Sequence, residues 1–344
     1  MDVNNKMKTR NYVAASLLSA VAIAVSGCSQ TPAQTESFDF VIGNSTINPN
    51  LSSGSAMVVN NSKIIVSGDD SPWLFDVADD FSIDSKTLID NFPVNQDNRV
   101  AHATKPDFES MTLLNYNNQP YYFVVGSGSK KVLRENAYLI PADGGDNIKL
   151  SLSQFYTDLH SAAGFKDEEK INIEGIANSA DETYIFNRGN EGKNAIFTMK
   201  TADMLNYLQG KIDHIPSLDV VEITLPSING VQACLSGADF WQSSNSLIYT
   251  ASVEGNNSSS VNDGEIQGSF VGVLPIDALN NKESLDLTPY SQLIQNAGKP
   301  VITKAESIAV AEQTSEQASG YVVSDNDNGT SQFFTFTIHK PSAL

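Results

Sequence analysis

The chain has 344 residues, of which 40% are hydrophobic, and a formal net charge of −19 at pH 7. That apolar content can build the core of one large domain, whereas the acid excess excludes a nucleic-acid-binding protein, because such binding depends on Lys and Arg neutralising phosphates. The same charge argues against a protein that lies flat on anionic lipid.

The first 27 residues predict a bacterial lipoprotein signal peptide. Three basic residues lie within the first ten positions, and an apolar run of 13 residues follows from Val13 to Val25. This run is too short for a helix that spans a bilayer, which needs about 20 residues, and it therefore indicates secretion. The run ends in Val25-Ser26-Gly27-Cys28, the residue order of a lipobox. The alternative is an incidental cysteine after an ordinary signal peptide.

We expect Cys28 to become the acylated N-terminus of the mature protein and to tether it to the cell envelope. Several acyl chains, such as palmitate, hold a protein durably on a membrane. Ser29, rather than Asp, follows the cysteine and favours the outer membrane over the inner one. Residues 28–36 are polar and unpatterned, which predicts a flexible tether. Residues 37–344 would then form the folded domain, which we expect to be a monomer.

The folded region contains five similar units of short strands bounded by Gly, Asn, Asp and Ser. The units begin near residues 55, 107, 173, 236 and 305. Matching positions at Ser55, Glu109, Glu174, Asp239 and Glu306 are 54, 65, 65 and 67 residues apart. A repeat of this length, with three or four strands per unit, predicts an all-β fold of the β-propeller type. We expect five blades; six blades and a pair of β-sandwiches are the alternatives.

The two ends of the folded region are expected to share one blade. The last unit has no fourth strand of its own after residues 331–338, and residues 37–42 read as a strand before the first unit. Their pairing would close the ring and cover a sheet edge that otherwise invites aggregation. Apolar spacing also predicts a helix at 152–159 and a shorter one at 202–208.

Strand direction brings two sets of residues to one face of such a ring. In an antiparallel blade, the start of the first strand and the turn between the second and third strands lie at the same end. The inner set comprises Glu109, Glu174, Asp239 and Glu306, and the outer set includes Asp69, Asp70, Ser127–Ser129, Arg188, Glu254 and Asp325–Asp327. We expect Glu109, Glu174, Arg188, Asp239 and Glu306 to bind a small-molecule or protein ligand.

The same four acids are candidate metal ligands. Carboxylates that converge on one axis repel each other unless a cation lies among them, and Ca²⁺ takes carboxylate oxygens. Glu109, Glu174, Asp239 and Glu306 could therefore hold calcium. Two alternatives stay open: the acids accept hydrogen bonds from backbone amides of neighbouring blades, or they act in catalysis. Asp325–Gly329 partly matches a calcium loop but lacks its distal Glu, so we predict a polar turn there.

The sequence singles out no catalytic residue. The four histidines show no metal-ligand spacing, and no nucleophile motif is present. Cys234 has no partner for a disulfide once Cys28 is lipidated, and we expect it to be buried and inert.

Four segments resemble a family of uncharacterised bacterial β-propeller proteins that is distantly similar to phytase-like propellers. They are Lys105-Pro106-Asp107-Phe108-Glu109, Gly126-Ser127-Gly128-Ser129, Ile171-Asn172-Ile173-Glu174-Gly175 and Asn187-Arg188-Gly189-Asn190. The resemblance implies the propeller fold, and its phytase-like relatives imply hydrolysis of phosphoesters with a divalent metal. We thus carry two functional hypotheses: an envelope propeller that binds a ligand, cation or protein, and a metal-dependent hydrolase of phosphoesters or lactones.

Overall fold

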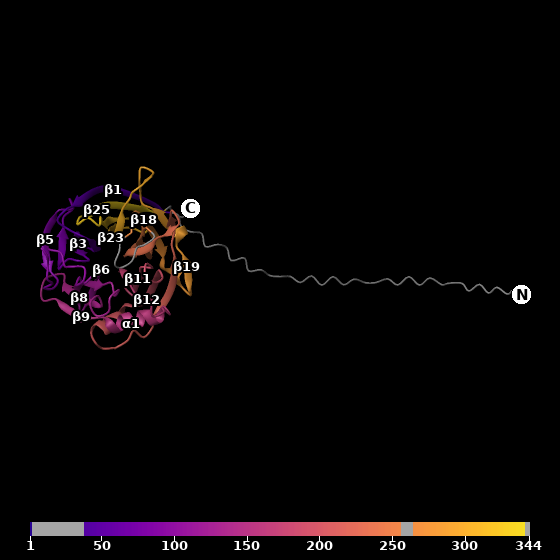
Figure 1. The fold of residues 1–344 in the computed structure, drawn as a ribbon, viewed down its shortest axis with the longest axis horizontal. Coiled ribbons are helices and arrows are strands. Elements are labelled where there is room, and N and C mark those ends of the chain that lie inside the picture. Colours follow the sequence, from indigo (N-terminus) through magenta and orange to yellow (C-terminus); the bar gives the residue numbers. More distant parts are fainter. Residues whose placement is uncertain (2–37, 256–263, 341–344) are drawn as a thin grey trace. The chain divides into compact units, whose positions relative to one another are not determined.

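The computed structural model describes Met1, residues 38–255 and residues 264–340. Five sheets lie radially around one axis, which makes residues 38–340 a five-bladed β-propeller (Figure 1). This confirms the predicted fold and blade number. Cys28, the signal peptide and the tether lie outside the described residues. No helix within the described ranges has the length and apolarity needed to cross a bilayer.

Blades I and II are each built from four consecutive antiparallel strands. Blade I contains β2 (Gly54–Asn60), β3 (Lys63–Gly68), β4 (Trp73–Val77) and β5 (Ile83–Leu88). Blade II contains β6 (Phe108–Tyr116), β7 (Gln119–Gly126), β8 (Asn136–Pro141) and β9 (Ile148–Ser151). In both blades the first strand lies at the axis and the fourth at the rim.

Blades III and IV are linked by one strand, which follows the third strand of blade IV in the chain but pairs with the sheet of blade III. Blade III contains β10 (Ile173–Asn178), β11 (Glu182–Asn187), β12 (Ala195–Lys200) and β13 (Asp219–Thr224), and it gains β19 (Ser284–Asp286) as a fifth, parallel strand. Blade IV contains β16 (Cys234–Trp241), β17 (Ser246–Glu254), β18 (Ile266–Pro275) and β20 (Ser291–Leu293). Two short hairpins precede the first strands of blades IV and V: β14 (Ser227–Ile228) with β15 (Val231–Gln232), and β21 (Gln295–Asn296) with β22 (Lys299–Pro300).

Blade V closes the ring with strands from both ends of the chain. It contains β23 (Lys304–Gln313), β24 (Gln317–Asp325), β25 (Ser331–His339) and, as its outer strand, β1 (Asp39–Asn48). Asp39 pairs with His339 and Asn48 with Ser331, so β1 runs toward the end of the axis where β2 begins. The predicted closing strand is therefore present and is longer than 37–42. Gln292 of blade IV also contacts the Phe38 carbonyl and the Phe40 amide.

The hydrophobic core consists of five layers, one between each pair of neighbouring blades. Phe108 and Met111 pack against blade I, for example, and Trp241 and Ile248 pack against blade V. Two helices, α1 (Ser153–Ala162) and α2 (Thr201–Leu208), extend the layer between blades II and III and confirm the predicted helices. Short 3₁₀ turns lie at η1 (Gln242–Ser244), η2 (Ile276–Leu279) and η3 (Thr288–Tyr290). The ring is thus held by packing between blades, without a disulfide among the described residues.

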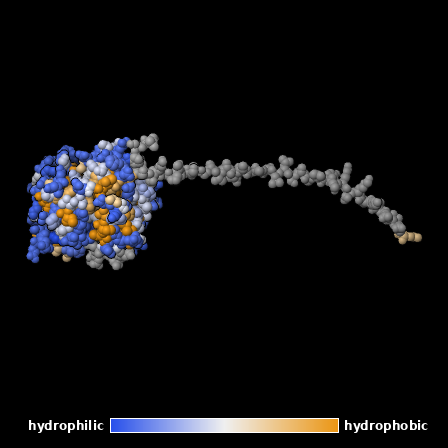
Figure 2. Space-filling view, turned by 90° about the horizontal axis from the view of Figure 1, so that it is seen from above, coloured by the Kyte–Doolittle hydropathy of each residue, from blue (hydrophilic) through white to orange (hydrophobic). Residues whose placement is uncertain are grey.

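The side of the propeller seen in Figure 2 is mainly hydrophilic, with apolar side chains gathered in patches among the polar ones. Val41 and Ile47 on β1 are each 56% exposed. Apolar atoms commonly make up half of a protein surface, so the wall by itself does not indicate a partner.

Gly237 lets the innermost strands of blades IV and V approach closely. A Cβ at this position would lie 2.5 Å from the Ser307 Cα and 2.7 Å from the Glu306 carbonyl oxygen. Both obstacles are backbone, so β16 and β23 would have to separate. We expect Gly237→Ala to destabilise the protein by about 1–3 kcal/mol, the usual range for overpacking, as measured by urea unfolding. Gly255→Ala, where the nearest atom would be 3.3 Å away, should cost much less; equal losses would contradict the explanation.

Candidate functional site: an acidic axial cavity

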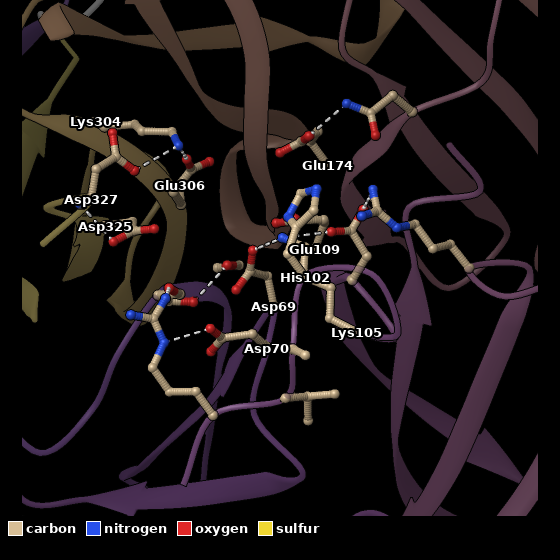
Figure 3. Close-up of a pocket in the computed structure, with 18 of the residues that line it drawn as sticks. Asp69, Asp70, His102, Lys105, Glu109, Glu174, Lys304, Glu306, Asp325 and Asp327 are labelled. Atoms are coloured by element: carbon tan, nitrogen blue, oxygen red, sulfur yellow. Dashed lines mark hydrogen bonds and ion pairs between the residues drawn. The ribbon is translucent and has the colours of Figure 1, made fainter. Parts of the chain in front are cut away.

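A cavity of about 400 Å³ lies on the axis at the end where the first strands begin. Nine carboxyl side chains, five Lys or Arg side chains and His102 line it, and of the described lining residues Val100 and Ala101 alone are apolar. The acids therefore exceed the bases by four. Figure 3 shows these side chains converging from separate blades.

A β-bulge in the first strand of each blade lies at this end of the axis. The extra residue is Ser55 in β2, Glu109 in β6, Glu174 in β10 and Glu306 in β23. A bulge leaves one residue without a cross-strand partner and re-aims its side chain. All four of these residues line the cavity. The structure thus brings together Glu109, Glu174 and Glu306, which the sequence placed in one set.

Blade IV departs from this pattern, and the structure does not bring Asp239 to the cavity. The bulge of β16 spans two residues, Ser236 and Gly237, so the repeat aligns Ser236 rather than Asp239 with the other acids. Asp239 accepts hydrogen bonds from the Phe240 amide at 2.7 Å and the Val310 amide at 2.8 Å. Asp239 therefore connects blades IV and V. This is the role given by the alternative hypothesis, in which the acids accept hydrogen bonds from backbone amides of neighbouring blades. Burial raises the pKa of Asp239 to about 6, and the two amides oppose that shift.

One group of charges lies between blades I and II. The Lys105 ammonium contacts the Asp69 carboxylate and lies 2.8 Å from Asp107 Oδ1. Arg134 Nη1 binds Asp107 Oδ2 at 2.7 Å, and Ser127 donates to the same oxygen. Burial alone would lower the pKa of Lys105, but Asp69 and Asp107 outweigh it and raise that pKa. Lys105 therefore stays charged as an internal cation.

A second group comes from blades III, IV and V and includes Arg188, which the sequence assigned to this face. Arg188 Nη1 lies 3.5 Å from Glu174, and its Nη2 lies 2.8 Å from Glu254. Lys304 Nζ lies 3.3 Å from both Glu254 and Glu306. Arg188 thus serves two acids, and Lys304, which also lies 3.2 Å from Asp327, serves three. Glu306 is only 4% exposed, and its Oε2 is buried without a hydrogen bond to any described residue.

Glu109 lies between these two groups and forms no hydrogen bond or ion pair within the described part of the chain. Burial, followed by repulsion from Glu174 and Asp107, raises the pKa of Glu109 well above its usual value. Burial likewise raises the pKa of Glu174 to about 8, although Arg188 opposes the shift. The pKa of Glu306 is raised for the same reason, against Lys304 and Arg188. Ionising these acids is costly unless a cation enters.

One cluster could hold a metal ion as it stands. Ligand oxygens of Asp69, Asp107 and Glu109 lie within 4.8 Å of one another, and no other such group occurs in the described ranges. Lys105 and Arg134 already neutralise two of these acids, however. Glu109 is the member common to this cluster and to the ring of bulge residues.

The loop between β5 and β6 also borders the cavity, and sequence patterns did not predict this. Its residues Arg99 and His102 line the cavity, and Figure 3 shows His102 among the acids. Arg99 Nε binds Asp70 Oδ2 at 2.6 Å, and the Val100 amide donates to the Asp70 carbonyl. This loop has no regular structure, so neither periodicity nor motif spacing could have placed His102 in the site.

Two other predictions concern residues near the cavity. Asp325–Gly329 forms the turn between β24 and β25, in which the Asp327 amide donates to Asp325 Oδ1 and Lys304 binds Asp327. This is the polar turn that was expected. Cys234 is partly buried at the start of β16, and burial raises the pKa of its thiol, which keeps it protonated.

Residues 50–338 match a family model described as a family of unknown function (DUF6929). The chain belongs to this family. The matched residues include strands of all five blades and the whole lining of the axial cavity, but they begin after β1. A search of curated proteins finds no match.

Several solved structures resemble this chain in fold. Glutaminyl cyclase from Myxococcus xanthus has 9% identity and a TM-score of 0.43, covering 88% of this chain and 97% of that one. A member of the duf4221 family from Bacteroides vulgatus has 10% identity and a TM-score of 0.41, covering 90% and 100%. An aldose sugar dehydrogenase from Streptomyces coelicolor has 10% identity and a TM-score of 0.39, covering 88% and 99%. At this similarity no activity transfers to the chain.

Proposed function

We propose that this protein is a lipid-anchored envelope propeller that binds a divalent cation, Ca²⁺ first among them, in its axial cavity. The observation that carries the proposal is Glu109. Its carboxyl group lies among eight other acids, has no partner among the described residues and is costly to ionise there. A divalent cation offsets such repulsion, and hard carboxylate oxygens are the ligands that Ca²⁺ prefers.

Two further features support a cation rather than an anion. The acids outnumber Lys and Arg by four in the cavity, and buried bases such as Lys105, Arg188 and Lys304 already serve acids. An oxyanion entering alone would meet a net negative field. The absence of aromatic side chains among the described lining residues also disfavours an organic ammonium ion, which proteins usually hold by cation–π contacts.

Calcium titration of the metal-stripped protein tests the proposal. We expect saturable binding by calorimetry and a rise in melting temperature, because a ligand that binds only the folded state stabilises it by about 2.7 kcal/mol at one hundred times its Kd. Mg²⁺ is the comparison ion, since it demands tighter octahedral geometry. Absence of binding by Ca²⁺, Mg²⁺, Mn²⁺ and Zn²⁺ alike would refute the proposal.

A metal-dependent hydrolase of phosphoesters or lactones is the second candidate. The observation that favours it is His102, whose imidazole lies beside the acids in a position to exchange protons with a ligand (Figure 3). General acid–base groups of this kind contribute about 10²–10⁴-fold to rates. A screen of phosphate monoesters and lactones with the Ca²⁺-loaded protein, repeated with His102→Ala, distinguishes the two: turnover that depends on both the metal and His102 establishes the hydrolase.

Anchoring is tested separately at Cys28. We expect the wild-type protein to fractionate with membranes and to carry a diacylglyceryl-modified Cys28 by mass spectrometry, whereas Cys28→Ser should be released or left with an uncleaved signal. Protein that is found in the soluble fraction with an unmodified Cys28 would contradict the proposed anchor, and it would leave the proposal of a cation site unaffected.

A further inference from the structure

A basic projection stands beside the acidic cavity, in the turn between β7 and β8. It consists of Lys130, Lys131 and Val132, all three exposed, with Val132 75% exposed; we call it the Lys130–Val132 projection. The same turn continues into Arg134, which lines the cavity. Lys130 Nζ donates to the Ala103 carbonyl at 3.1 Å. Lys130 is thus tied to the loop that carries His102, whose side chain lines the cavity, although Lys130, Lys131 and Val132 lie outside that lining.

The projection has a strained backbone that its neighbours hold in place. Val132 has φ = +65°, a left-handed conformation that is a genuine outlier for a β-branched residue. The Val132 amide donates to Glu135 Oε2 at 2.8 Å, and Asn136 Nδ2 donates to the Val132 carbonyl at 2.8 Å. Such strain costs free energy and persists only where the surroundings impose it. The hydrogen bonds therefore hold the backbone of Val132 in place, while its apolar side chain is exposed and not packed in the core.

Charge is segregated along the path into the cavity. Inside, acids exceed bases and the buried bases are paired. Outside the cavity lining, on the turn that leads into Arg134, Lys130 and Lys131 form no ion pair with any described residue. An anion is therefore repelled from the interior, and its favourable contacts are a bound cation and these two ammonium groups. Charge-assisted hydrogen bonds from lysine suit carboxylate and phosphate oxygens.

We propose that the cavity takes its cation together with a small anionic ligand, carrying a carboxylate or phosphate group, that is held beside the cavity by Lys130 and Lys131. A polar part of this ligand reaches the cation, its anionic group lies against the two lysines, and Val132 provides a rigid apolar contact. This inference rests on the proposed cation site and names the ligand class of that site.

The test uses the Ca²⁺-saturated protein and two probes, glycerol 2-phosphate and succinate, titrated separately by calorimetry. The two arms distinguish a phosphate from a carboxylate ligand. We expect at least one probe to bind, and Lys130→Ala combined with Lys131→Ala to weaken it roughly tenfold, since two charge-assisted contacts are lost. Calcium affinity of this double variant should stay within twofold of wild type.

The matched control is Lys211→Ala combined with Lys282→Ala, which removes two exposed lysines that follow α2 and η2 and lie outside the turn between β7 and β8. It should bind the probe as wild type does. If Ca²⁺ binds but neither probe does, or if the Lys130/Lys131 variant binds the probe normally, the inference is overturned and the cation site stands. If no metal binds at all, the proposed function itself has failed.

Discussion

Glu109→Gln is expected to weaken Ca²⁺ binding by roughly tenfold or more, because calcium affinity depends strongly on the number of charged ligands. Glutamine keeps the shape of the side chain and removes its charge. Glu109 belongs both to the ring of bulge residues and to the cluster with Asp69 and Asp107. Its replacement should therefore affect the cation wherever on the axis it lies, as measured by calorimetry at pH 7.5.

Two companion variants locate the cation. Glu306→Gln should reduce affinity if the cation lies within the ring, and Asp69→Asn should reduce it if the cation lies against blade I. Asp239→Asn is the control, because this acid connects blades IV and V through two amides and does not line the cavity. Equal Ca²⁺ affinity of wild type and Glu109→Gln would exclude a site built on these acids.

The same Glu109→Gln variant has an opposite effect on stability without metal. The pKa of Glu109 is raised in the folded protein, so above about pH 4.3, the usual value for Glu, the folded state holds more protons than the unfolded state. Stability from this group therefore falls as pH rises toward the folded pKa. Glutamine has no such loss. Urea unfolding at pH 8 should show the metal-free variant to be more stable than wild type, with the difference vanishing near pH 4.

The second large effect is expected from removal of β1. A chain that starts at residue 50 lacks Asp39–Asn48, so β25 becomes an exposed edge, and Phe336 and Ile338 lose their cover from Phe38 and Phe40. Phe38 is only 4% exposed, and truncation of a buried Phe to Ala typically lowers the free energy of unfolding by about 3–5 kcal/mol. A protein domain has only about 5–15 kcal/mol in total. We therefore expect this chain to aggregate or to lose its cooperative unfolding transition.

The control is a chain that starts at residue 37, which keeps β1 and removes everything before it. It should unfold at the same urea concentration as the mature protein, followed by circular dichroism. A chain starting at residue 50 that remained monomeric with an unchanged midpoint would show that closure by β1 is dispensable.

The fold was predictable because each blade repeats the same local pattern. Short apolar strands alternate with polar turns, and the outer strand of blade V was recognisable at residues 37–42 because the last unit lacked a partner. Glu109, Glu174 and Glu306 were found because each lies next to the start of a first strand. Asp239 was misplaced because blade IV has Ser236, not an acid, at the bulge position, so the repeat was aligned on the next acid of that strand, three residues further along.

The remainder of the site depends on contacts that no local pattern encodes. Lys105 reaches Asp69 across 36 positions of sequence, and Arg99 reaches Ser53 across 46. His102 lies on a loop without regular structure, and the strain at Val132 follows from hydrogen bonds to Glu135 and Asn136 rather than from the residue itself. These features come from tertiary packing and are visible only in three dimensions.

The direction of β1 also sets how the protein would stand on a membrane. Asp39 pairs with the last residue of β25, at the end of the axis away from the cavity, and Asn48 pairs with the first. The chain therefore enters the propeller from the side opposite the mouth. With Cys28 acylated, the roughly ten residues before Asp39 reach at most about 35 Å. The proposed anchor would therefore favour an orientation in which the cavity faces the aqueous phase.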